Sequence, residues 1–330
     1  MKKYSIVFLV LAVLAVGLVQ VALSADPKMS FSIATGGTGG VWYPLGGSIS
    51  NVVTKKVPNT EMTAESTTAA VDNLKLLVNN KVGMAFCDDY QIALINEGIL
   101  PAVSDKRHAV RLVMPFYDQP LQIVTKEGSG VKVLADLKGK RVSTGAPNSG
   151  TEVQAEAVLR GLGLDWKKDI TREKLGAKES VDALKDGKIA AAFWSGAVPT
   201  SSIIDLAATP GLKMVILTIA GADAEKITKA NPYVFNKSLI KKGSYQGLDT
   251  DVETLGTATV LAAMESLPAE QVEKILTVTF DSKAEIAAIW KGMADLTPAS
   301  SMDQVSPDMY KFLHPGAKKY FKDKTAKPIN

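Results

Sequence analysis

The residues best suited to chemistry in this chain form a glycine-rich loop. Residues 35–47 read Thr-Gly-Gly-Thr-Gly-Gly-Val-Trp-Tyr-Pro-Leu-Gly-Gly, after a short β-type run at 31–34 and before a helix-like segment that continues to Val53. Glycine lets the backbone take positive φ and come close to a bound molecule. The start of a helix offers unpaired N–H groups and partial positive charge. Together these features predict a cradle for a small acidic ligand.

Four further loops occupy a similar position, because ligands in open α/β sheets gather where strands end and helices begin. The second loop holds hydroxyl groups that either cap the following helix or face a ligand. The fourth either places N–H and hydroxyl donors at another helix start or is an ordinary turn. In the fifth loop, a tryptophan either forms part of the wall of a cleft or packs in the hydrophobic core. The residues are Ser66, Thr67 and Thr68 in the second loop, Pro147, Asn148, Ser149, Gly150 and Thr151 in the fourth, and Trp194, Ser195 and Gly196 in the fifth.

The third loop follows an apolar strand-like run and contains Asp88, Asp89 and Tyr90. Two adjacent carboxylates are too few for a calcium site without further ligands. One of them either caps the next helix or binds the ammonium group of a substrate. Cys87, which precedes them, is expected to be a small buried residue rather than a nucleophile, because no histidine lies near it in the sequence.

Several enzyme classes are disfavoured by motifs that the sequence lacks. No Gly-Lys-Ser/Thr follows Gly36, and Trp42 stands where a dinucleotide-binding loop counted from Gly37 needs its third glycine. No Gly-x-Ser-x-Gly nucleophile elbow occurs. The chain has only two histidines and one cysteine, which disfavours histidine-based catalysis and zinc sites and leaves no intrachain disulfide. We therefore expect no catalytic residue, no metal and no cofactor.

These loops must be positioned by strands and helices that alternate along the chain, which is typical of an α/β fold. Expected strands are 31–34, 60–64, 84–87, 110–116, 121–125, 141–144, 190–194, 213–219 and 252–262. Expected helices include 69–78, 151–160, 181–186, 200–207, 269–278 and 283–294. The length fits two lobes, each a parallel or mixed sheet flanked by helices, with the ligand cleft between them.

The chain is expected to change lobes twice. Residues 115–120 join two strand-like runs with no room for a helix, which makes Tyr117, Asp118 and Gln119 the expected hinge. The extended run 252–262 would return the chain to the first lobe. Lobe one is then 26–118 plus 254–330, and lobe two is 119–253.

The N-terminus reads as a secretory signal over residues 1–25. Lys2 and Lys3 precede an apolar run, and small residues (Ala22, Ser24 and Ala25) then offer a cleavage site. The alternative is a retained membrane anchor, since the run is near the length that spans a bilayer. The formal net charge of +4 falls to +2 without Lys2 and Lys3, and no basic stripe suggests nucleic acid.

The glycine-rich loop at 35–47 resembles the signature of the TAXI family, the extracytoplasmic solute receptors of tripartite ATP-independent periplasmic (TRAP) transporters. Further matching segments at 66–74, 145–151, 185–193, 242–250 and 313–320 extend the resemblance over nearly the whole exported chain. Carried onto this sequence, the resemblance implies the following ligand-binding residues: Gly37, Thr38, Gly39, Gly40, Val41, Trp42, Tyr43, Ser66, Thr67, Thr68, Asp88, Asp89, Tyr90, Tyr117, Pro147, Asn148, Ser149, Gly150, Thr151, Trp194, Ser195 and Gly196.

The resemblance also implies a two-lobed periplasmic-binding fold, a monomer in the periplasm, and a membrane permease partner driven by an ion gradient. The implied ligands are glutamate, glutamine or related dicarboxylates such as 2-oxoglutarate. One departure stands out, because many relatives have Gln and a small residue where this chain has Cys87 and Asp88. A carboxylate there would repel an acidic ligand, so either the ligand is neutral or amine-bearing, or Asp88 points away.

Three other functions stay open at this point. A receptor domain that feeds a membrane sensor kinase would bind a ligand without transporting it. An exported hydrolase would need a nucleophile–base pair, and none is visible in the sequence. A purely structural or antigenic surface protein would bind no small ligand.

Overall fold

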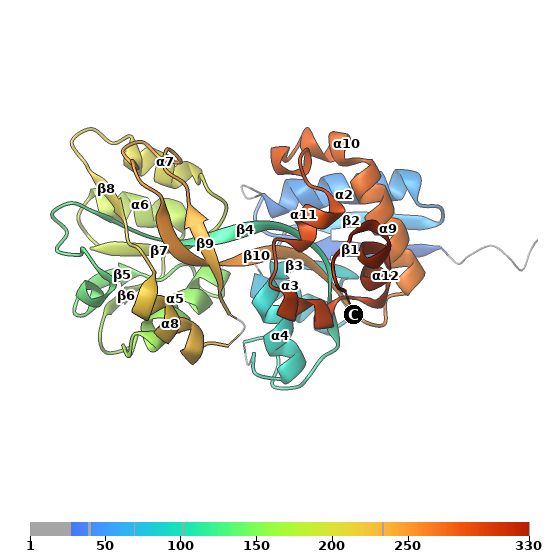
Figure 1. Cartoon of the computed structure of the whole chain (residues 1–330), viewed down its shortest axis with the longest axis horizontal. Helices are drawn as coiled ribbons and strands as arrows, with labels where there is room; N and C mark the ends of the chain where they lie inside the picture. The colour runs from blue at the N-terminus through green and yellow to red at the C-terminus, as the bar shows by residue number, and fades with distance from the viewer. Residues whose placement is uncertain (1–27, 39–40, 69, 101, 233, 330) are drawn as a thin grey trace, which may run out of the picture.

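Two long strands run through the molecule and join its two lobes (Figure 1). The computed structural model describes residues 28–38, 41–68, 70–100, 102–232 and 234–329. β4 (Val110–Lys126) and β10 (Val252–Met264) pair antiparallel, from Val110 opposite Met264 to Pro120 opposite Gly256. Within the described residues, the strands form one sheet in the order β2-β1-β3-β10-β4-β7-β5-β6, with β8 on β4 and β9 on β10.

Lobe one surrounds the pairing of β10 with the first half of β4, on the right of Figure 1. β1 is parallel to β2 and β3, while β3 is antiparallel to β10. The strands are β1 (Met29–Ala34), β2 (Thr60–Glu65) and β3 (Met84–Asp88), and the helices are α2 (Trp42–Lys56), α3 (Ala70–Val78), α4 (Asp89–Glu97), α9 (Ala269–Asp281), α10 (Lys283–Ala287), α11 (Pro298–Met302) and α12 (Pro315–Lys324), with 3-10 turns at Lys291–Met293 and Pro307–Phe312.

Lobe two surrounds the second half of β4, which pairs antiparallel with β7 and β8. β5 is parallel to both β6 and β7. The strands are β5 (Arg141–Ser143), β6 (Thr171–Glu173), β7 (Ala191–Ser195), β8 (Met214–Ile216) and β9 (Asn236–Ile240), and the helices are α5 (Gly150–Gly161), α6 (Ala177–Lys185), α7 (Ser201–Ala207) and α8 (Gly221–Ala230), with a 3-10 turn at Leu134–Leu137.

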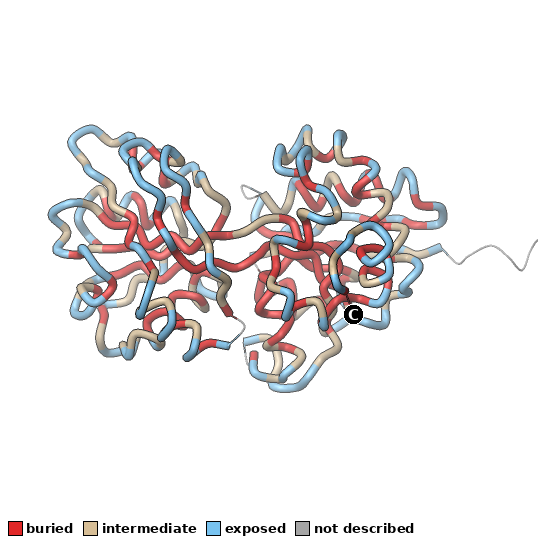
Figure 2. The backbone as a smooth tube through the Cα atoms, in the orientation of Figure 1, coloured by how far each residue is buried: buried red, intermediate tan, exposed pale blue. Residues whose placement is uncertain are grey.

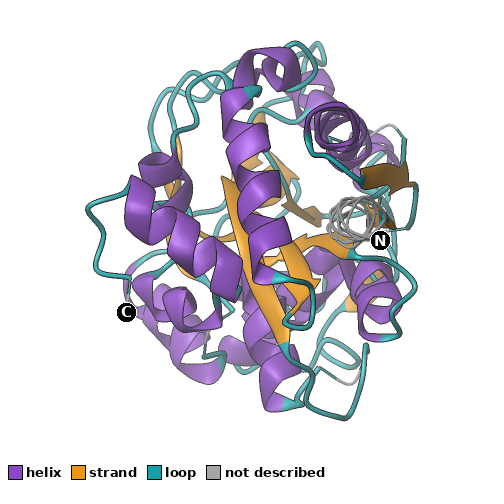
Figure 3. Ribbon diagram, turned by 90° about the vertical axis from the view of Figure 1, so that its right-hand side faces the viewer, coloured by secondary structure: helices purple, strands orange, loops and turns teal. Residues whose placement is uncertain are grey.

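Each lobe has its own hydrophobic core. β3 is buried along its whole length and lies in one large cluster with α2 and α9. In lobe two, separate clusters lie around Phe193 and around Ala192, neighbours on β7 whose side chains point to opposite faces of the sheet. Buried residues are concentrated in the strands of each lobe (Figure 2), and helices cover the strands on the outside (Figure 3). Removal of these apolar faces from water therefore holds each lobe together separately.

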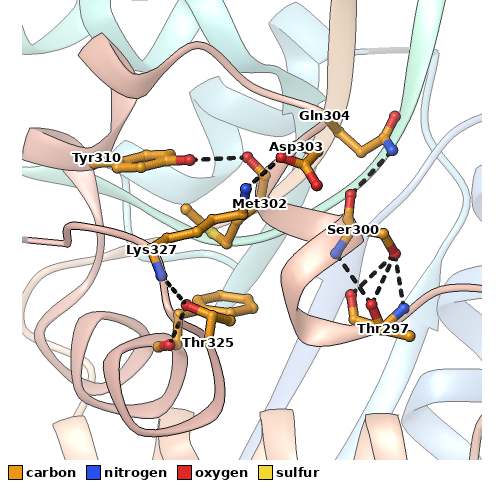
Figure 4. Close-up of polar contacts among 9 residues, drawn as sticks. Thr297, Ser300, Met302, Asp303, Gln304, Tyr310, Thr325 and Lys327 are labelled. Atoms are coloured by element: carbon orange, nitrogen blue, oxygen red, sulfur yellow. Dashed lines mark hydrogen bonds and ion pairs between the residues drawn. The ribbon is translucent and has the colours of Figure 1, made fainter.

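The C-terminal segment braces β4 close to the point where it leaves lobe one. Thr297 caps α11 by accepting a hydrogen bond from the backbone N–H of Ser300 (3.1 Å), and Tyr310 and Lys327 hold the same region from outside (Figure 4). The hydroxyl of Ser301 donates to the carbonyl of Pro115 (2.5 Å). The side chain of Gln304 accepts from the backbone N–H of Asp118 (3.0 Å). These bonds fix the lobe-one end of the connecting strand.

The expected α/β fold with two lobes is confirmed, with differences in detail. The runs 110–116 and 121–125 form one continuous strand, and the short strands β6 and β9 were not predicted. The predicted helix 283–294 is wrong beyond Ala287, because Trp290 has extended backbone angles (φ −129°, ψ 104°) and its ring packs on Phe116 and Tyr117. The residue numbers of the lobe boundaries stay a prediction.

The predicted signal over residues 1–25 lies outside the described residues. Among the helices of the described part, none combines the length and the apolar character that a bilayer crossing requires.

Candidate functional site

A cavity of about 680 Å³ lies between the two lobes. Its walls are the loops that follow the strands of both lobes and the first turns of the helices behind them. Lobe one contributes Gly36, Gly37, Val41, Trp42, Thr68, Ala70 and Asp88, the connecting strand β4 contributes Tyr117 and Gln119, and lobe two contributes Ala146, Ser149, Gly150, Thr151, Gly176, Ala177, Lys178, Trp194, Ser195, Gly196, Ala197, Pro199, Thr200, Ser201 and Ser202.

The wall from lobe one is held by the tryptophan that starts α2. The indole N–H of Trp42 points to the hydroxyl oxygens of Tyr117 (3.1 Å) and Thr259 (3.3 Å). Its ring stacks on Phe86, with the ring centroids 5.8 Å apart. These contacts join α2, β3, β4 and β10, so the indole is fixed against the sheet before any ligand arrives.

The wall from lobe two is held by hydroxyl groups that bond to the backbone. Ser149 caps α5, where its side chain accepts a hydrogen bond from the backbone N–H of Glu152 (3.2 Å). The Thr151 hydroxyl oxygen accepts from the backbone N–H of Ser195 (3.2 Å), and the indole of Trp194 donates to Thr200 (3.1 Å). The capping role considered for the fourth loop is therefore present for Ser149.

Several helices begin at this cavity. The first residues of α2, α3, α5, α6 and α7 all line it, and they come from both lobes. The first N–H groups of a helix lack partners inside the helix, and the helix dipole adds partial positive charge there. The cavity is therefore suited to hold an anionic group.

Asp88 is the buried charged group of the cavity wall, with a residue exposure of 3%. It precedes α4 as the N-cap, and its backbone N–H donates to the side chain of Gln91 (3.0 Å). The amide of Gln119 donates to Asp88 Oδ1 (2.7 Å). Burial and the neighbouring Asp89 raise the pKa of Asp88 to about 7, although hydrogen bonds from Gln119 and Thr257 oppose the rise. Asp88 thus caps a helix and also faces the cavity.

The structure brings twelve of the sequence-predicted site residues together on the cavity wall. They are Gly37, Val41, Trp42, Thr68, Asp88, Tyr117, Ser149, Gly150, Thr151, Trp194, Ser195 and Gly196. Among the described residues, the following predicted ones are not on that wall: Thr38, Tyr43, Ser66, Thr67, Asp89, Tyr90, Pro147 and Asn148. Gly39 and Gly40 lie outside the described residues.

Asp89 and Tyr90 are placed away from the cavity by their packing. Asp89 accepts hydrogen bonds from the backbone N–H of Ala258 (3.1 Å) and from the side chain of Asn236 (3.1 Å). Burial raises the pKa of Asp89 to about 6 in spite of these bonds. Tyr90 is fully buried in a cluster with Ala157 and Val234 of lobe two. Both residues therefore connect the lobes beside the cavity.

The hydroxyl groups of the second loop bond to nearby residues of lobe one. Ser66 donates to the carbonyl of Gly36 (3.0 Å), and Thr67 donates to Asn73 (2.5 Å). Asn73 in turn donates to the carbonyl of Phe86 (2.8 Å). These bonds tie the second loop to the glycine loop and to β3.

Three parts of the cavity wall were not among the predicted site residues, and one of them is the start of α7 with Thr200, Ser201 and Ser202. The first turn of α6, including the exposed Lys178, follows β6, a three-residue strand without a clear apolar pattern. Gln119 was expected at the hinge but not in the cavity, where it bonds to Asp88. A buried glutamine between two apolar strand segments was the available signal, because such a side chain needs a polar partner.

Two solved structures, each with a TM-score of 0.51, support the fold. A TctC solute-binding protein from Polaromonas shares 16% identity over 90% of this chain and 98% of its own, with a TM-score of 0.51. A protein from Bordetella bronchiseptica RB50 shares 17% identity over 91% of both chains, with a TM-score of 0.51. The alkanesulfonate-binding protein SsuA from Xanthomonas axonopodis pv. citri shares 15% identity over 91% of this chain and 86% of its own, with a TM-score of 0.48.

The family comparison covers almost all of the described fold. The model of the NMT1-like family matches residues 33–324, from β1 through α12, and so includes both walls of the cavity. The chain therefore belongs to the NMT1-like family.

Proposed function

We propose that this protein is an extracytoplasmic solute receptor that captures a small carboxylate-bearing ligand as its lobes close. The observation that carries the proposal is the convergence of helix starts from both lobes on one cavity. A carboxylate bound there would accept hydrogen bonds from α2 on one side and from α5 and α6 on the other. Binding, not turnover, is the activity that this arrangement serves.

The energetics require contributions from both lobes. A micromolar dissociation constant corresponds to about 8 kcal/mol. A helix start contributes roughly 0.3–1 kcal/mol, or up to about 2 kcal/mol when partly buried. Each hydrogen bond to a charged group contributes about 1.5–3 kcal/mol. Several donors are needed at once, so the ligand favours the closed form through the extra contacts it makes there.

The TAXI resemblance of the glycine loop supports the finer part of the proposal. On that basis the ligand is glutamate, glutamine or a related dicarboxylate. The protein acts in the periplasm as a monomer. Its closed form delivers the ligand to a TRAP permease that is driven by an ion gradient. The similarity to a TctC solute-binding protein from Polaromonas supports solute binding in general. Stimulation of uptake by a TRAP permease in proteoliposomes would distinguish transport from the sensor-kinase alternative.

A binding screen tests the proposal directly. Ligand carried through purification is removed by partial unfolding, and thermal shift with amino acids and dicarboxylates is followed by calorimetry. We expect at least one of glutamate, glutamine or 2-oxoglutarate to raise the melting temperature and bind at micromolar concentration. Absence of binding throughout the screen would contradict the proposal.

A double variant locates the binding site. Ser149→Ala with Thr151→Ala should weaken binding more than tenfold, because it removes the cap of α5 and the hydrogen bond that joins the α5 start to the Ser195 backbone. Thr228→Ala, which removes a hydroxyl that bonds within α8, is the matched control and should leave affinity unchanged. Equal affinity of the double variant and the control would argue against this cavity.

A further inference from the structure

Asp88 is a buried acid with no cationic side chain as a partner among the described residues. The charged residues that line the cavity are Asp88 and Lys178, and Lys178 is exposed and paired with Asp182 (2.7 Å). Within the part of the chain that the structure describes, the ion pairs do not include Asp88. A buried carboxylate without a counter-ion is costly, which makes its presence in a binding cavity informative.

The groups around Asp88 are neutral or acidic on every side. From β4, Gln119 donates to it and Tyr117 lies near it, and from β10 the Thr257 hydroxyl donates to it. On its own segment it is flanked by Cys87, Asp89 and Tyr90, whose ionised forms would all be negative. From lobe two, the backbone of Gly150 lies against Oδ2, where an added Cβ would come within 2.3 Å. Among the described residues, Asp88 therefore faces the starts of α4 and α5 but no cationic side chain.

A ligand in this cavity therefore meets two different surfaces. Helix starts of both lobes favour an anionic group, while Asp88 repels a second one and attracts a cation. A dicarboxylate has a group for the helix starts but none for Asp88. An amino acid carries a carboxylate for the helix starts and, next to it, an ammonium group for Asp88.

We propose that Asp88 is the specificity-determining residue of this site, accepting hydrogen bonds from a ligand ammonium group and so selecting amino acids over the corresponding dicarboxylic acids. This inference rests on the proposed function, because it concerns the ligand of the same cavity.

A contact between Asp88 and a ligand ammonium group determines whether ligand affinity rises or falls with pH. In the ligand-free cavity, Asp88 with a pKa of about 7 shares its population between neutral and ionised forms near neutral pH. An ammonium group binds the ionised form and lowers this pKa, so affinity for an amino acid rises with pH up to about 7 and then levels off. An acid without the amine binds the neutral form better, so its affinity falls over the same range.

Calorimetry with L-glutamate and glutarate, which differ only in the ammonium group, tests the inference on the intact exported chain. We expect glutamate to bind at least tenfold more tightly than glutarate, and its affinity to increase between about pH 6 and about pH 8. Asp88→Asn should remove at least tenfold of the glutamate affinity and flatten its pH dependence. Asp186→Asn, which removes a surface carboxylate paired with Lys188, is the charge-matched control.

The possible outcomes are separable. Glutarate binding as tightly as glutamate, or glutamate affinity that falls with rising pH, overturns the role of Asp88 and leaves the proposed receptor function in place. Failure of every amino acid and dicarboxylate to bind the wild-type protein overturns both. The pH dependence is measured on the wild-type protein, so the inference can be judged even if Asp88→Asn folds poorly.

Discussion

At the scale of single residues, two adjacent acids have separate tasks. Asp89 accepts hydrogen bonds from β9 and β10 and so supports the connection between the lobes. Asp88 lies one residue earlier, caps α4 and faces the cavity. Side chains that follow each other at the end of a strand point in different directions, so neighbouring carboxylates need not share one function.

Burial of these acids predicts how stability depends on pH. The folded-state pKa of Asp88, about 7, lies above the ordinary value of 3.8, so the folded protein holds an extra proton between these values. Unfolding free energy should therefore fall as pH rises through this range. Asp89, with a pKa of about 6, acts in the same direction.

Urea unfolding of the ligand-free protein at about pH 5.5 and about pH 7.5 measures this effect. We expect the wild type to lose about 1–2 kcal/mol more than Asp88→Asn over that interval. His314, whose pKa is lowered by burial, contributes equally in both proteins and cancels from the comparison. Parallel pH profiles of the two proteins would mean that Asp88 is ionised in the folded state.

At the scale of elements, α2 carries two adjacent glycines with different surroundings. A Cβ added at Gly46 would lie 2.6 Å from Thr35 Cγ2 and 3.3 Å from the ring of Phe86, whereas at Gly47 it would meet nothing within 4 Å. The first glycine lets α2 lie close to Thr35, directly after β1, and to Phe86 of β3. The second has no such contact and only lowers helix propensity.

The two positions should therefore respond in opposite ways to alanine. Gly46→Ala should lower the unfolding free energy by about 1–3 kcal/mol through overpacking. Gly47→Ala should leave it unchanged or raise it by up to about 1 kcal/mol. Thermal and urea unfolding of both variants measure the difference. Similar destabilisation by the two substitutions would show that α2 does not depend on this close approach.

Sequence patterns were informative where an element depends on local periodicity. The buried run of β3 and the helical spacing of α3 place the second and third loops correctly. Patterns failed where distant contacts decide the outcome. The ring of Trp290, which follows α10, packs on Tyr117, a residue 173 positions earlier in the sequence. Tyr90 is buried by lobe two, which no local pattern reveals.

The same distinction applies to the candidate site. The glycine loop and the α5 start can be predicted from residue type, because glycine and hydroxyl residues cluster there after apolar runs. Lys178 follows a strand of three mixed residues, and its place on the cavity wall depends on how α6 packs in lobe two. The position of Asp88 on the cavity wall likewise depends on how lobe two packs against lobe one, which the local sequence does not reveal.

At the scale of the whole molecule, the lobes are connected by two strands and also touch beside the cavity. Tyr90 of α4 packs against Ala157 of α5, and the side chain of Gln154 donates to the Thr257 hydroxyl (3.4 Å). Between these contacts, Asp88 lies directly against Gly150. The lobes are therefore in direct contact beside the cavity, and there is little room between Asp88 and Gly150.

Gly150 makes this closure testable. An added Cβ would come within 2.3 Å of Asp88 Oδ2, and the carboxylate is held in place by its 2.7 Å hydrogen bond from Gln119. Alanine is otherwise acceptable at the first position of α5. Gly150→Ala should therefore keep each lobe folded but hinder the last step of closure.

Small-angle scattering and calorimetry together measure that step. We expect Gly150→Ala to increase the radius of gyration in the presence of ligand and to weaken binding at least tenfold, because donors from the two lobes no longer meet around the ligand. Gly47→Ala, an alanine in open space, is the control and should match the wild type in both measurements. If Gly150→Ala has the affinity and radius of gyration of the wild type, Asp88 moves aside freely. Close contact between Asp88 and Gly150 is then not required for ligand binding.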